Sequence, residues 1–347
     1  MAEYIKEKGF TIQSLASDPS PLLEGQVWYN TTSTVLKGYK AVLGTGAWSS
    51  GGALNTGRSD MGGSGTQTAT LAYFGSTGLG ISVAETYDGS TWTNTTSGTS
   101  TRHGGGSIGQ LQTDAAYVGG YSAPPPPLQS GKTEKWNGSA WTESGDLQSG
   151  RQGFYGGAGT TAAGLVAGSG PADGATETFN GTSWSEVNNL VTARQYAAVC
   201  GLTSTAAICV GGYGIPSASP YSNGPGSRVG LTETWDGTSW TQSANTLALG
   251  RIESALSGTS TDAVIAGGST GDPAPPTAPT ATAETWDGTS WTSVASMADV
   301  QKNGGKRSSG GSTTSIVMGG GPAGSVSASE EWTVPATTYA TKTFTAS

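Results

Sequence analysis

Histidine, cysteine and charged residues are scarce in this sequence. Its 347 residues include one histidine and two cysteines, and 12% of them are charged. Because copper and zinc sites normally need several His or Cys ligands, we expect no metal site and no other cofactor. Cys200 and Cys209 are too few for a disulfide framework. They fall on neighbouring strands of one expected hairpin, where they could be bridged, but buried free thiols are favoured.

Basic clusters and long apolar runs are also missing. The net charge is -8, which argues against a nucleic-acid partner. No stretch approaches the ~20 apolar residues of a spanning helix, so membrane insertion is not expected. The N-terminal segment lacks the apolar region of a standard signal peptide. Helical patterning is nearly absent, and only Glu3–Lys8 suggests a helical turn.

Glycine and aromatic residues, by contrast, are abundant and recur in one motif. Each copy has Glu, an aromatic residue, Asp-Gly or Asn-Gly and then Trp; the best copies are Glu233–Trp240 and Glu284–Trp291, and weaker ones begin at Glu85, Glu134 and Glu177. Asp-Gly and Asn-Gly accept positive φ at little cost and favour tight hairpin turns. The motif therefore predicts strand, turn and strand, and a unit repeated at this spacing decides the fold.

Four strands are expected in each repeat, which we call A to D. A cation precedes strand A, strand B is apolar and ends in Gly-Gly or a variant, strand C carries Glu-x-aromatic, and strand D begins with Trp. The six strand C aromatics are Tyr87, Trp136, Phe179, Trp235, Trp286 and Trp332. The six strand D tryptophans are Trp48, Trp92, Trp141, Trp184, Trp240 and Trp291.

These two sets are out of phase along the chain. Trp48 has no complete set of A, B and C strands before it, and Trp332 is followed by Thr-Val-Pro335. A ring resolves the mismatch if the strand around Trp48 completes the last repeat, which also removes loose sheet edges. Alternatively, Leu36–Leu43 could be a seventh, degenerate strand C that competes with Trp332 for that place.

The four markers resemble the kelch repeat, which has them in this order at ~50 residues per blade. The resemblance covers residues 48–334 and implies an all-β, six-bladed kelch-like β-propeller of four-stranded antiparallel blades, closed by an N-terminal strand. Two B strands depart from Gly-Gly, at Phe74-Gly-Ser76 and Ala167-Gly-Ser169. We expect an N-terminal attachment segment with a hairpin at 1–35, the propeller at 36–334 and a C-terminal tail at 335–347, which could be one more strand.

The regularly repeated residues have structural explanations. The cations are Arg58, Arg102, Arg151, Arg194, Arg251 and Lys302. They could form a positive ring that holds an anion, but a Glu also recurs in every blade. Because a partly buried charge needs a partner, we favour bonds to carbonyls or to the strand C Glu of a neighbouring blade. The strand D tryptophans are expected in the core between sheets rather than as a platform for a ligand.

The connections between strands B and C vary, and three of them are long. They are Tyr121–Gln129, Tyr213–Arg228 and Ser269–Pro279. Insertions on one face of a repeat protein often mark the binding side, and proline lowers the entropy cost of ordering a loop. Candidate ligand-binding residues are Tyr121, Tyr213, Tyr221, Arg228 and Asp272. The alternative is that these loops are solvated decorations or assembly contacts.

No catalytic residue is assigned. His103 could formally belong to a Ser-His-Asp triad, but no Gly-x-Ser-x-Gly elbow accompanies it. Galactose oxidase resembles this chain in fold only, because its copper site uses two histidines. The sialidase Asp-box resembles Asp236–Trp240 with a different spacing. Glycoside hydrolysis usually needs two specially placed carboxylates; Asp173, Glu253 and Asp272 are irregular enough to be candidates, but nothing marks a pair.

The segment Gly25–Lys37 resembles one found in tail-fibre and other virion proteins of bacteriophages, although an ordinary hairpin would also fit. The leading hypothesis is a non-enzymatic structural and binding protein of a virion, such as a bacteriophage tail, fibre or head appendage. It would attach to other virion proteins through residues 1–35, present its loops to a host surface glycan and need no signal peptide. It could be a homo-oligomer. The alternatives are an intracellular kelch scaffold that binds a protein partner and a sialidase-like glycosidase.

Overall fold

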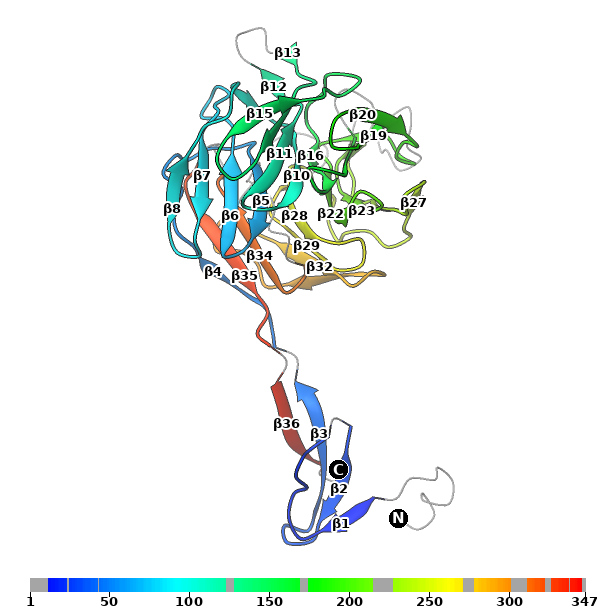
Figure 1. The fold of residues 1–347 in the computed structure, drawn as a ribbon. Coiled ribbons are helices and arrows are strands. Elements are labelled where there is room, and N and C mark those ends of the chain that lie inside the picture. The colour runs from blue at the N-terminus through cyan, green and yellow to red at the C-terminus, as the bar shows by residue number, and fades with distance from the viewer. Residues whose placement is uncertain are drawn as a thin grey trace. The chain divides into compact units, whose positions relative to one another are not determined.

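Strands make up every regular element in the part of the chain that the computed structural model describes (Figure 1). The described residues are 12–23, 25–42, 44–122, 128–168, 174–214, 227–270, 278–300, 311–321, 326–336 and 338–344. Since these ranges contain no helix, they offer none that is long and apolar enough to cross a membrane. The chain divides into a small unit, Met1–Gly46 with Val334–Ser347, and a large unit, Ala47–Thr333.

The small unit is one four-stranded sheet that joins the two ends of the chain. Its strands are β1 (Gln13–Leu15), β2 (Val27–Asn30), β3 (Val35–Val42) and β36 (Thr338–Phe344), in the order β1-β2-β3-β36. The expected hairpin is formed by β2 and β3, and β3 pairs with β36 along seven residues from Leu36 opposite Phe344 to Val42 opposite Thr338.

The position of β3 corrects two sequence-based expectations. The repeat pattern assigns the segment from residue 36 onward to the propeller, with the alternative that Leu36–Leu43 forms a seventh strand C. Instead β3 lies in the small unit, because its antiparallel ladder is completed by β36. The boundary therefore falls after Gly46, and the tail at 335–347 supplies a strand of the same sheet as β3.

A buried indole and one carboxylate hold the small unit together. Trp28 in β2 is fully buried, and its Nε1 donates to Asp18 Oδ1 over 3.1 Å. Asn30 Nδ2 and Lys37 Nζ reach the same oxygen, each at 2.9 Å. The hydrogen bond from Lys37 is the largest contribution that lowers the pKa of Asp18. Asp18 thus fastens the segment before β2 onto the hairpin.

The large unit is built from mainly antiparallel sheets whose strands follow the A-to-D order. Four sheets are β5 (Gly62–Thr66), β6 (Ala69–Tyr73), β7 (Ala84–Tyr87) and β8 (Trp92–Thr95); β10 (Gly106–Leu111), β11 (Asp114–Val118), β14 (Thr133–Trp136) and β15 (Trp141–Ser144); β17 (Ala158–Gly159), β18 (Gly164–Ala167), β19 (Thr176–Phe179) and β20 (Trp184–Val187); and β28 (Ala255–Gly258), β29 (Ala263–Ala266), β32 (Ala283–Trp286) and β33 (Trp291–Val294). The fifth adds β16 (Tyr155–Gly156) to β22 (Ala198–Thr203), β23 (Ala206–Val210), β26 (Thr232–Trp235) and β27 (Trp240–Gln242).

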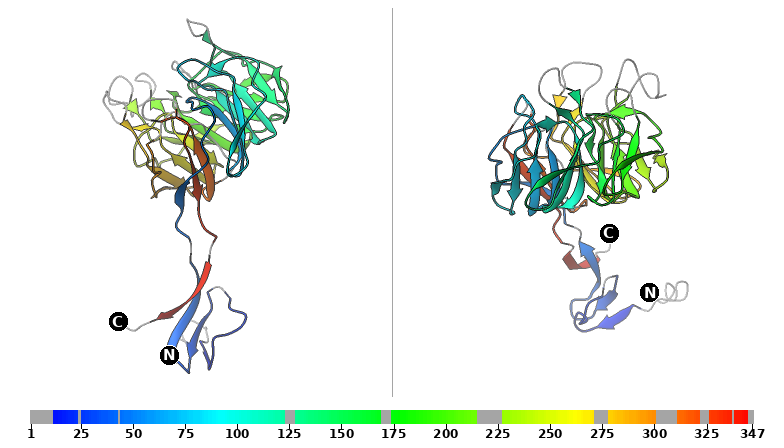
Figure 2. Two further views of the ribbon diagram at one scale, coloured as in Figure 1. Left: turned by 90° about the vertical axis from the view of Figure 1, so that its left-hand side faces the viewer. Right: turned by 45° about the horizontal axis from the view of Figure 1, so that its top comes forward.

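One further sheet combines strands from the two ends of the large unit. It contains β34 (Thr314–Met318), β35 (Ser329–Thr333) and β4 (Ala47–Ser50), with Trp332 opposite Trp48. This is the pairing expected from the phase mismatch of the aromatic markers. The first strands of successive sheets also contact one another, as β5 does β10 and β22 does β28. The arrangement is consistent with a propeller-like fold (Figure 2).

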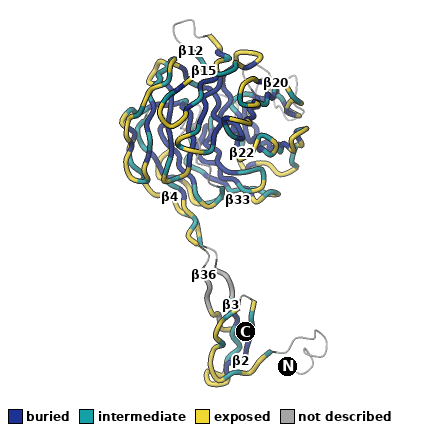
Figure 3. Tube along the Cα trace, viewed as in Figure 1, coloured by how far each residue is buried: buried dark blue, intermediate teal, exposed yellow. Residues whose placement is uncertain are grey.

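Many residues along the strands of the large unit are buried (Figure 3), and buried side chains from adjacent sheets form common clusters. Tyr73 of one sheet and Trp141 of the next belong to one buried cluster, with ring centroids 5.2 Å apart. Indole Nε1 atoms at strand D donate to the preceding sheet, as Trp184 does to Thr133 Oγ1 over 2.8 Å and Trp240 to Thr176 Oγ1 over 2.9 Å. The strand D tryptophans therefore combine apolar burial with a satisfied polar atom. Cys200 and Cys209 are buried and form no disulfide, as favoured above.

Candidate binding face

The three long B–C connections begin as two-stranded ribbons at the same end of their sheets. The ribbons are β12 (Tyr121–Ser122) with β13 (Leu128–Gln129), β24 (Tyr213–Gly214) with β25 (Ser227–Arg228), and β30 (Ser269–Thr270) with β31 (Ala278–Pro279). Each is paired with the segment that precedes strand A: β12 with β9 (Arg102–His103), β24 with β21 (Arg194–Gln195), and Ser269 with Ile252. We call the surface formed by these ribbons the loop face.

The structure places three of the five predicted ligand-binding residues on these ribbons. Tyr121 is half-buried, and its ring lies 5.5 Å from that of His103. Tyr213 and Arg228 are half-buried and lie opposite each other in the β24–β25 ladder. Tyr221 and Asp272 lie outside the described residues. Tyr121 therefore belongs to a different ribbon from Tyr213 and Arg228.

Buried ion pairs anchor the base of the loop face. The pairs are Arg58–Glu85, Arg102–Glu134 at 2.9 Å, Arg151–Glu177 at 2.6 Å, Arg194–Glu233 at 3.1 Å and Arg251–Glu284 at 2.8 Å. The guanidinium groups also donate to backbone carbonyls, as expected, for example Arg251 Nη1 to Thr282 O over 3.0 Å. The sixth cation, Lys302, lies outside the described residues.

The partner of each arginine corrects the expectation of a contact between neighbouring blades. Arg251 precedes β28, and Glu284 is in β32 of the same sheet, because the guanidinium reaches past strand B to strand C. The other carboxylate oxygen makes the link between sheets: Glu284 Oε2 accepts from the N–H of Ala248, in the segment arriving from the preceding sheet, over 3.0 Å. Burial lowers the pKa of Arg251, and the charge of Glu284 opposes this shift.

A second set of contacts runs along the inner ends of the sheets. The residue two positions after each of these five ion-paired arginines has positive φ: Asp60 at 53°, Gly104 at 67°, Gly153 at 72°, Tyr196 at 55° and Glu253 at 58°. Backbone N–H groups join them in sequence: Gly104 donates to Asp60 O over 2.9 Å, Gly153 to Gly104 O over 2.8 Å, Tyr196 to Gly153 O over 2.6 Å and Glu253 to Tyr196 O over 3.2 Å. We call these five residues the inner row.

Polar and aromatic side chains gather around the inner row. Tyr155 Oη donates to Asp60 Oδ1 over 2.8 Å, and Ser59 Oγ donates to Asp60 Oδ2 over 3.1 Å. Burial raises the pKa of Tyr155, and the charges of Asp60 and Glu253 raise it further. The ring of Tyr196 lies 6.1 Å from that of Tyr155. Tyr155 therefore links the carboxylate of Asp60 to the ring of Tyr196, and the charge of Glu253 acts on both tyrosines.

The first ribbon connects with this cluster. Burial, the largest cause, raises the pKa of Tyr196, and Tyr121 contributes to the shift. Burial lowers the pKa of His103, while the charge of Asp60 acts in the opposite direction. His103 Nδ1 is buried and has no hydrogen-bond partner. Tyr121 and His103 therefore belong to the same electrostatic environment as the inner row.

Sequence reasoning missed most of this cluster. Glu253 was considered only as an irregular acid, while Asp60, Tyr155 and Tyr196 were not considered. A signal was available, because the position two residues after the arginine is Gly104 or Gly153 in some repeats and carries a side chain in others. Variation at a position where the backbone favours glycine would have singled out the inner row.

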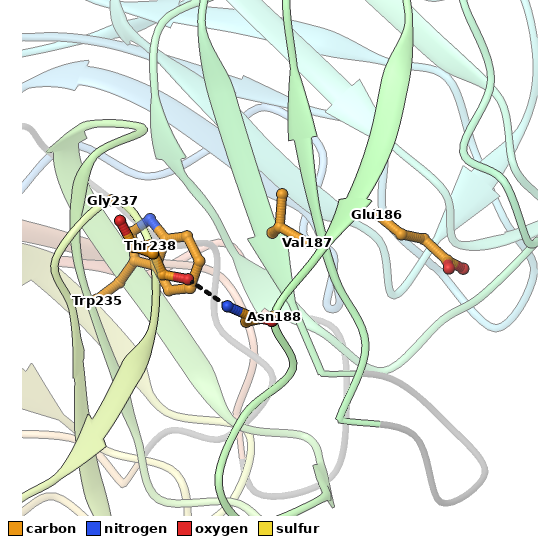
Figure 4. Close-up of a pocket in the computed structure, with 6 residues that line it drawn as sticks. All are labelled: Glu186, Val187, Asn188, Trp235, Gly237 and Thr238. Atoms are coloured by element: carbon orange, nitrogen blue, oxygen red, sulfur yellow. Dashed lines mark hydrogen bonds between the residues drawn. The ribbon is translucent and has the colours of Figure 1, made fainter.

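An open pocket of about 430 Å³ lies elsewhere, between strand D of one sheet and the C–D turn of the next. Its lining residues are Glu186, Val187, Asn188, Trp235, Gly237 and Thr238 (Figure 4). Asn188 Nδ2 donates to Thr238 O over 2.8 Å, and Asn245 Nδ2 makes the same contact with Thr289 O over 2.7 Å. Because this contact repeats between sheets, we assign the pocket a structural origin.

The described residues contain no group of three or more His, Cys, Asp or Glu side chains placed to hold a metal ion. No protein-family model and no curated protein matches the sequence. Among solved structures, the one titled "Structure of YjhT" matches with a TM-score of 0.66 and 12% sequence identity, over 84% of this chain and 99% of that chain. At this identity the similarity shows the fold alone, which is all-β with many antiparallel sheets.

Proposed function

We propose that the large unit is a six-bladed, kelch-like β-propeller closed by β4, and that the chain is a non-enzymatic binding protein of a virus particle. In this proposal a bacteriophage tail, fibre or head appendage presents the loop face to a host surface glycan. The five complete sheets and the β34-β35-β4 sheet would be the six blades. The pairing of β4 with β35 supports closure, because it joins the first and last strands of the large unit.

The observation that carries the binding role is the common origin of the three ribbons. Each long B–C connection is paired with a segment next to a buried arginine, so each ribbon starts from a fixed base. A rigid scaffold that holds variable loops is a frequent design for recognition. It lowers the entropy lost on binding, since the bases of the loops are already ordered.

The small unit supports an attachment role for the N-terminal segment. The chain enters the large unit after β3 and returns to β36, and these two strands pair with each other. Both connections to the large unit therefore come from one sheet, which also contains the segment resembling virion proteins, Gly25–Lys37. If the small unit attaches the chain to the particle, the loop face of the large unit is left available for binding.

The binding role can be tested with purified full-length chain and cells of the host strain. Replacing the β12–β13 ribbon by a short Gly-Ser connection should greatly reduce retention on the cells, and the same exchange at β24–β25 or β30–β31 should weaken it. The control is Asp236→Asn, in a turn at the opposite ends of the strands. Asn180 makes the same backbone bonds in another repeat, so this variant should fold and bind normally. Undiminished retention of all three ribbon variants would refute a binding role for the loop face.

A further inference from the structure

We propose that the inner row and its surrounding side chains form a site for the terminal residue of a neutral, hydroxyl-rich glycan. This inference rests on the proposed binding function and specifies which ligand the loop face takes and where. The site residues are Asp60, His103, Tyr121, Tyr155, Tyr196 and Glu253.

The first argument is the backbone conformation of the inner row. Asp60, Tyr196 and Glu253 have φ between 53° and 58°, a region that non-glycine residues occupy rarely and at a cost. The equivalent residues Gly104 and Gly153 adopt it without that cost. Strained residues of this kind cluster at functional sites. The fold accepts glycine here, so the three side chains are the feature that needs a functional explanation.

The second argument is the chemistry of these side chains. An ionised carboxylate has about four lone-pair positions, and Tyr155 and Ser59 use two of those on Asp60. Asp60 can therefore accept further bonds from ligand hydroxyls. Tyr155 uses its only hydroxyl proton on Asp60, so toward a ligand its oxygen can only accept. Burial raises the pKa of Tyr196, so its phenol stays protonated and can donate. Tyrosine also offers an apolar ring face that can pack against the C–H groups of a sugar.

His103 supplies a donor of a different kind. A proton on its buried Nδ1 would have no acceptor, so the neutral ring keeps its proton on Nε2. The ring packs against Tyr121 at a centroid distance of 5.5 Å. His103 directly precedes Gly104, whose N–H donates to Asp60 O over 2.9 Å, so this pair of rings adds an N–H donor and an aromatic ring next to the inner row. A mixture of aromatic surface and a few polar groups is typical of small-ligand sites.

The third argument is charge, which selects among sugars. The carboxylate of Asp60, whose hydrogen-bond partners Tyr155 and Ser59 are both neutral, makes the site acidic. The five described arginines beneath the loop face are each paired with a glutamate of their own sheet. They are therefore not available to bind an anion, and a uronic or sialic acid would bring its carboxylate toward that of Asp60. Neutral sugars meet no such repulsion.

Rigidity is the fourth argument, because a single sugar offers little binding surface. Consecutive backbone hydrogen bonds of 2.6 to 3.2 Å link the members of the inner row. The site is thus largely ordered before the ligand arrives, which reduces the entropy lost on binding.

The test uses the full chain, methyl glycosides and saturation-transfer NMR in the presence of EDTA. The neutral panel is methyl glucoside, galactoside, mannoside, N-acetylglucosaminide and N-acetylgalactosaminide; the acidic panel is methyl glucuronide and methyl N-acetylneuraminide. We expect at least one neutral glycoside to bind and neither acidic one. Asp60→Asn, Glu253→Gly and Tyr121→Ala should each weaken binding at least tenfold. Glu143→Gln, which removes an exposed acid from β15, is the matched control and should change nothing.

Several outcomes would overturn the inference: no binding by any neutral glycoside, preference for an acidic one, dependence on a divalent cation, or unchanged affinity in all three variants. Thermal unfolding of the three variants separates a lost contact from a lost fold, because each should still unfold cooperatively well above the temperature of the binding assay. Different results would show whether the inferred sugar site or the proposed function has failed. If the three site variants bind host cells normally while ribbon deletions do not, only the inference fails. If the sugar binds but the chain is not part of a particle, only the virion role fails.

Discussion

Trp48 lies directly opposite Trp332 in the ladder of β4 and β35, with their ring centroids 5.4 Å apart. Trp48 Nε1 also donates to Ala295 O over 2.9 Å, just beyond β33. One side chain near the start of the large unit thus contacts two sheets formed near its end. The first strand therefore has a structural role in the last part of the unit.

This contact predicts the effect of Trp48→Ala. The side chain is half-buried, so the loss should be below the ~3–5 kcal/mol of a fully buried tryptophan, at about 2 kcal/mol. Urea unfolding followed by circular dichroism measures it. Ser50→Ala, at an exposed position of β4, is the control and should lie within about 0.5 kcal/mol of the parent. Equal stability of Trp48→Ala and the parent would argue against closure by β4.

The buried ion pairs predict a much larger effect for Arg251→Ala. The guanidinium is 1% exposed and the carboxylate of Glu284 is 3% exposed. Removing one partner leaves the other charge buried without compensation, at a cost of about 3–5 kcal/mol. Lys132→Ala is the comparison, since Lys132 and Glu143 are 46% and 56% exposed. It should cost at most about 1 kcal/mol. Similar melting temperatures for the two variants would contradict this view of the arginines.

At the inner row, introducing glycine and removing glycine should have opposite backbone effects on the free energy of unfolding. Gly104→Ala should destabilise by about 1 kcal/mol through conformation alone. The added Cβ would meet nothing closer than Gln152 Oε1 at 3.9 Å. Glu253→Gly should remove about 1 kcal/mol of backbone cost, because glycine adopts the positive φ freely, and this gain is set against the contacts that the side chain makes. Glu143→Gly, in a regular strand, should destabilise by about 0.5–1 kcal/mol. Thermal unfolding gives the signs, and a loss of stability in Glu253→Gly would show that the side-chain contacts of Glu253 outweigh the cost of its positive φ.

Cys209 predicts a fall in stability at alkaline pH. Burial raises the pKa of its thiol from 9.0 to about 11. Between these values the thiol is ionised in the unfolded chain and protonated in the folded one. The unfolded state therefore binds fewer protons, and stability falls as pH rises from 9 toward 11. Urea unfolding at pH 8, 9 and 10 measures the slope, which should be shallower in Cys209→Ala. Identical slopes would contradict the buried, protonated thiol, as would rapid labelling of Cys209 in the folded chain.

Local rules were enough to predict much of the large unit. The Asp-Gly motif predicts a turn, and the structure has Asp88 Oδ1 accepting from the N–H of Ser90 and Thr91 over 2.9 and 2.8 Å. The phase of the aromatic markers predicts that Trp48 and Trp332 share a sheet. Turn chemistry is encoded within a few residues, and the recurrence of the markers along the sequence shows which repeat is incomplete, so neither inference needs a known long-range contact.

Other features depend on contacts that short stretches do not encode. The pairing of β3 with β36 joins opposite ends of the chain. The weak alternation of apolar and polar residues in 335–347 predicts a strand but does not indicate which strand it pairs with. The positive φ angles of the inner row also could not be predicted from short stretches of sequence. The residue types Asp60, Tyr196 and Glu253 do not specify positive φ; neighbouring backbone groups impose it. The long loop that begins at Tyr121 marks this residue as a candidate in the sequence, but the sequence does not predict that its ring contacts His103.

The measurement that tests the central claim most directly is quantitative mass spectrometry of purified extracellular particles from the source culture. We predict that this chain co-purifies with capsid protein at a fixed stoichiometry through successive gradients. The copy number per particle would then distinguish a fibre from a head decoration. A chain that remains in the cell lysate, or is lost from the particles on further purification, would contradict the claim that it is a virion component.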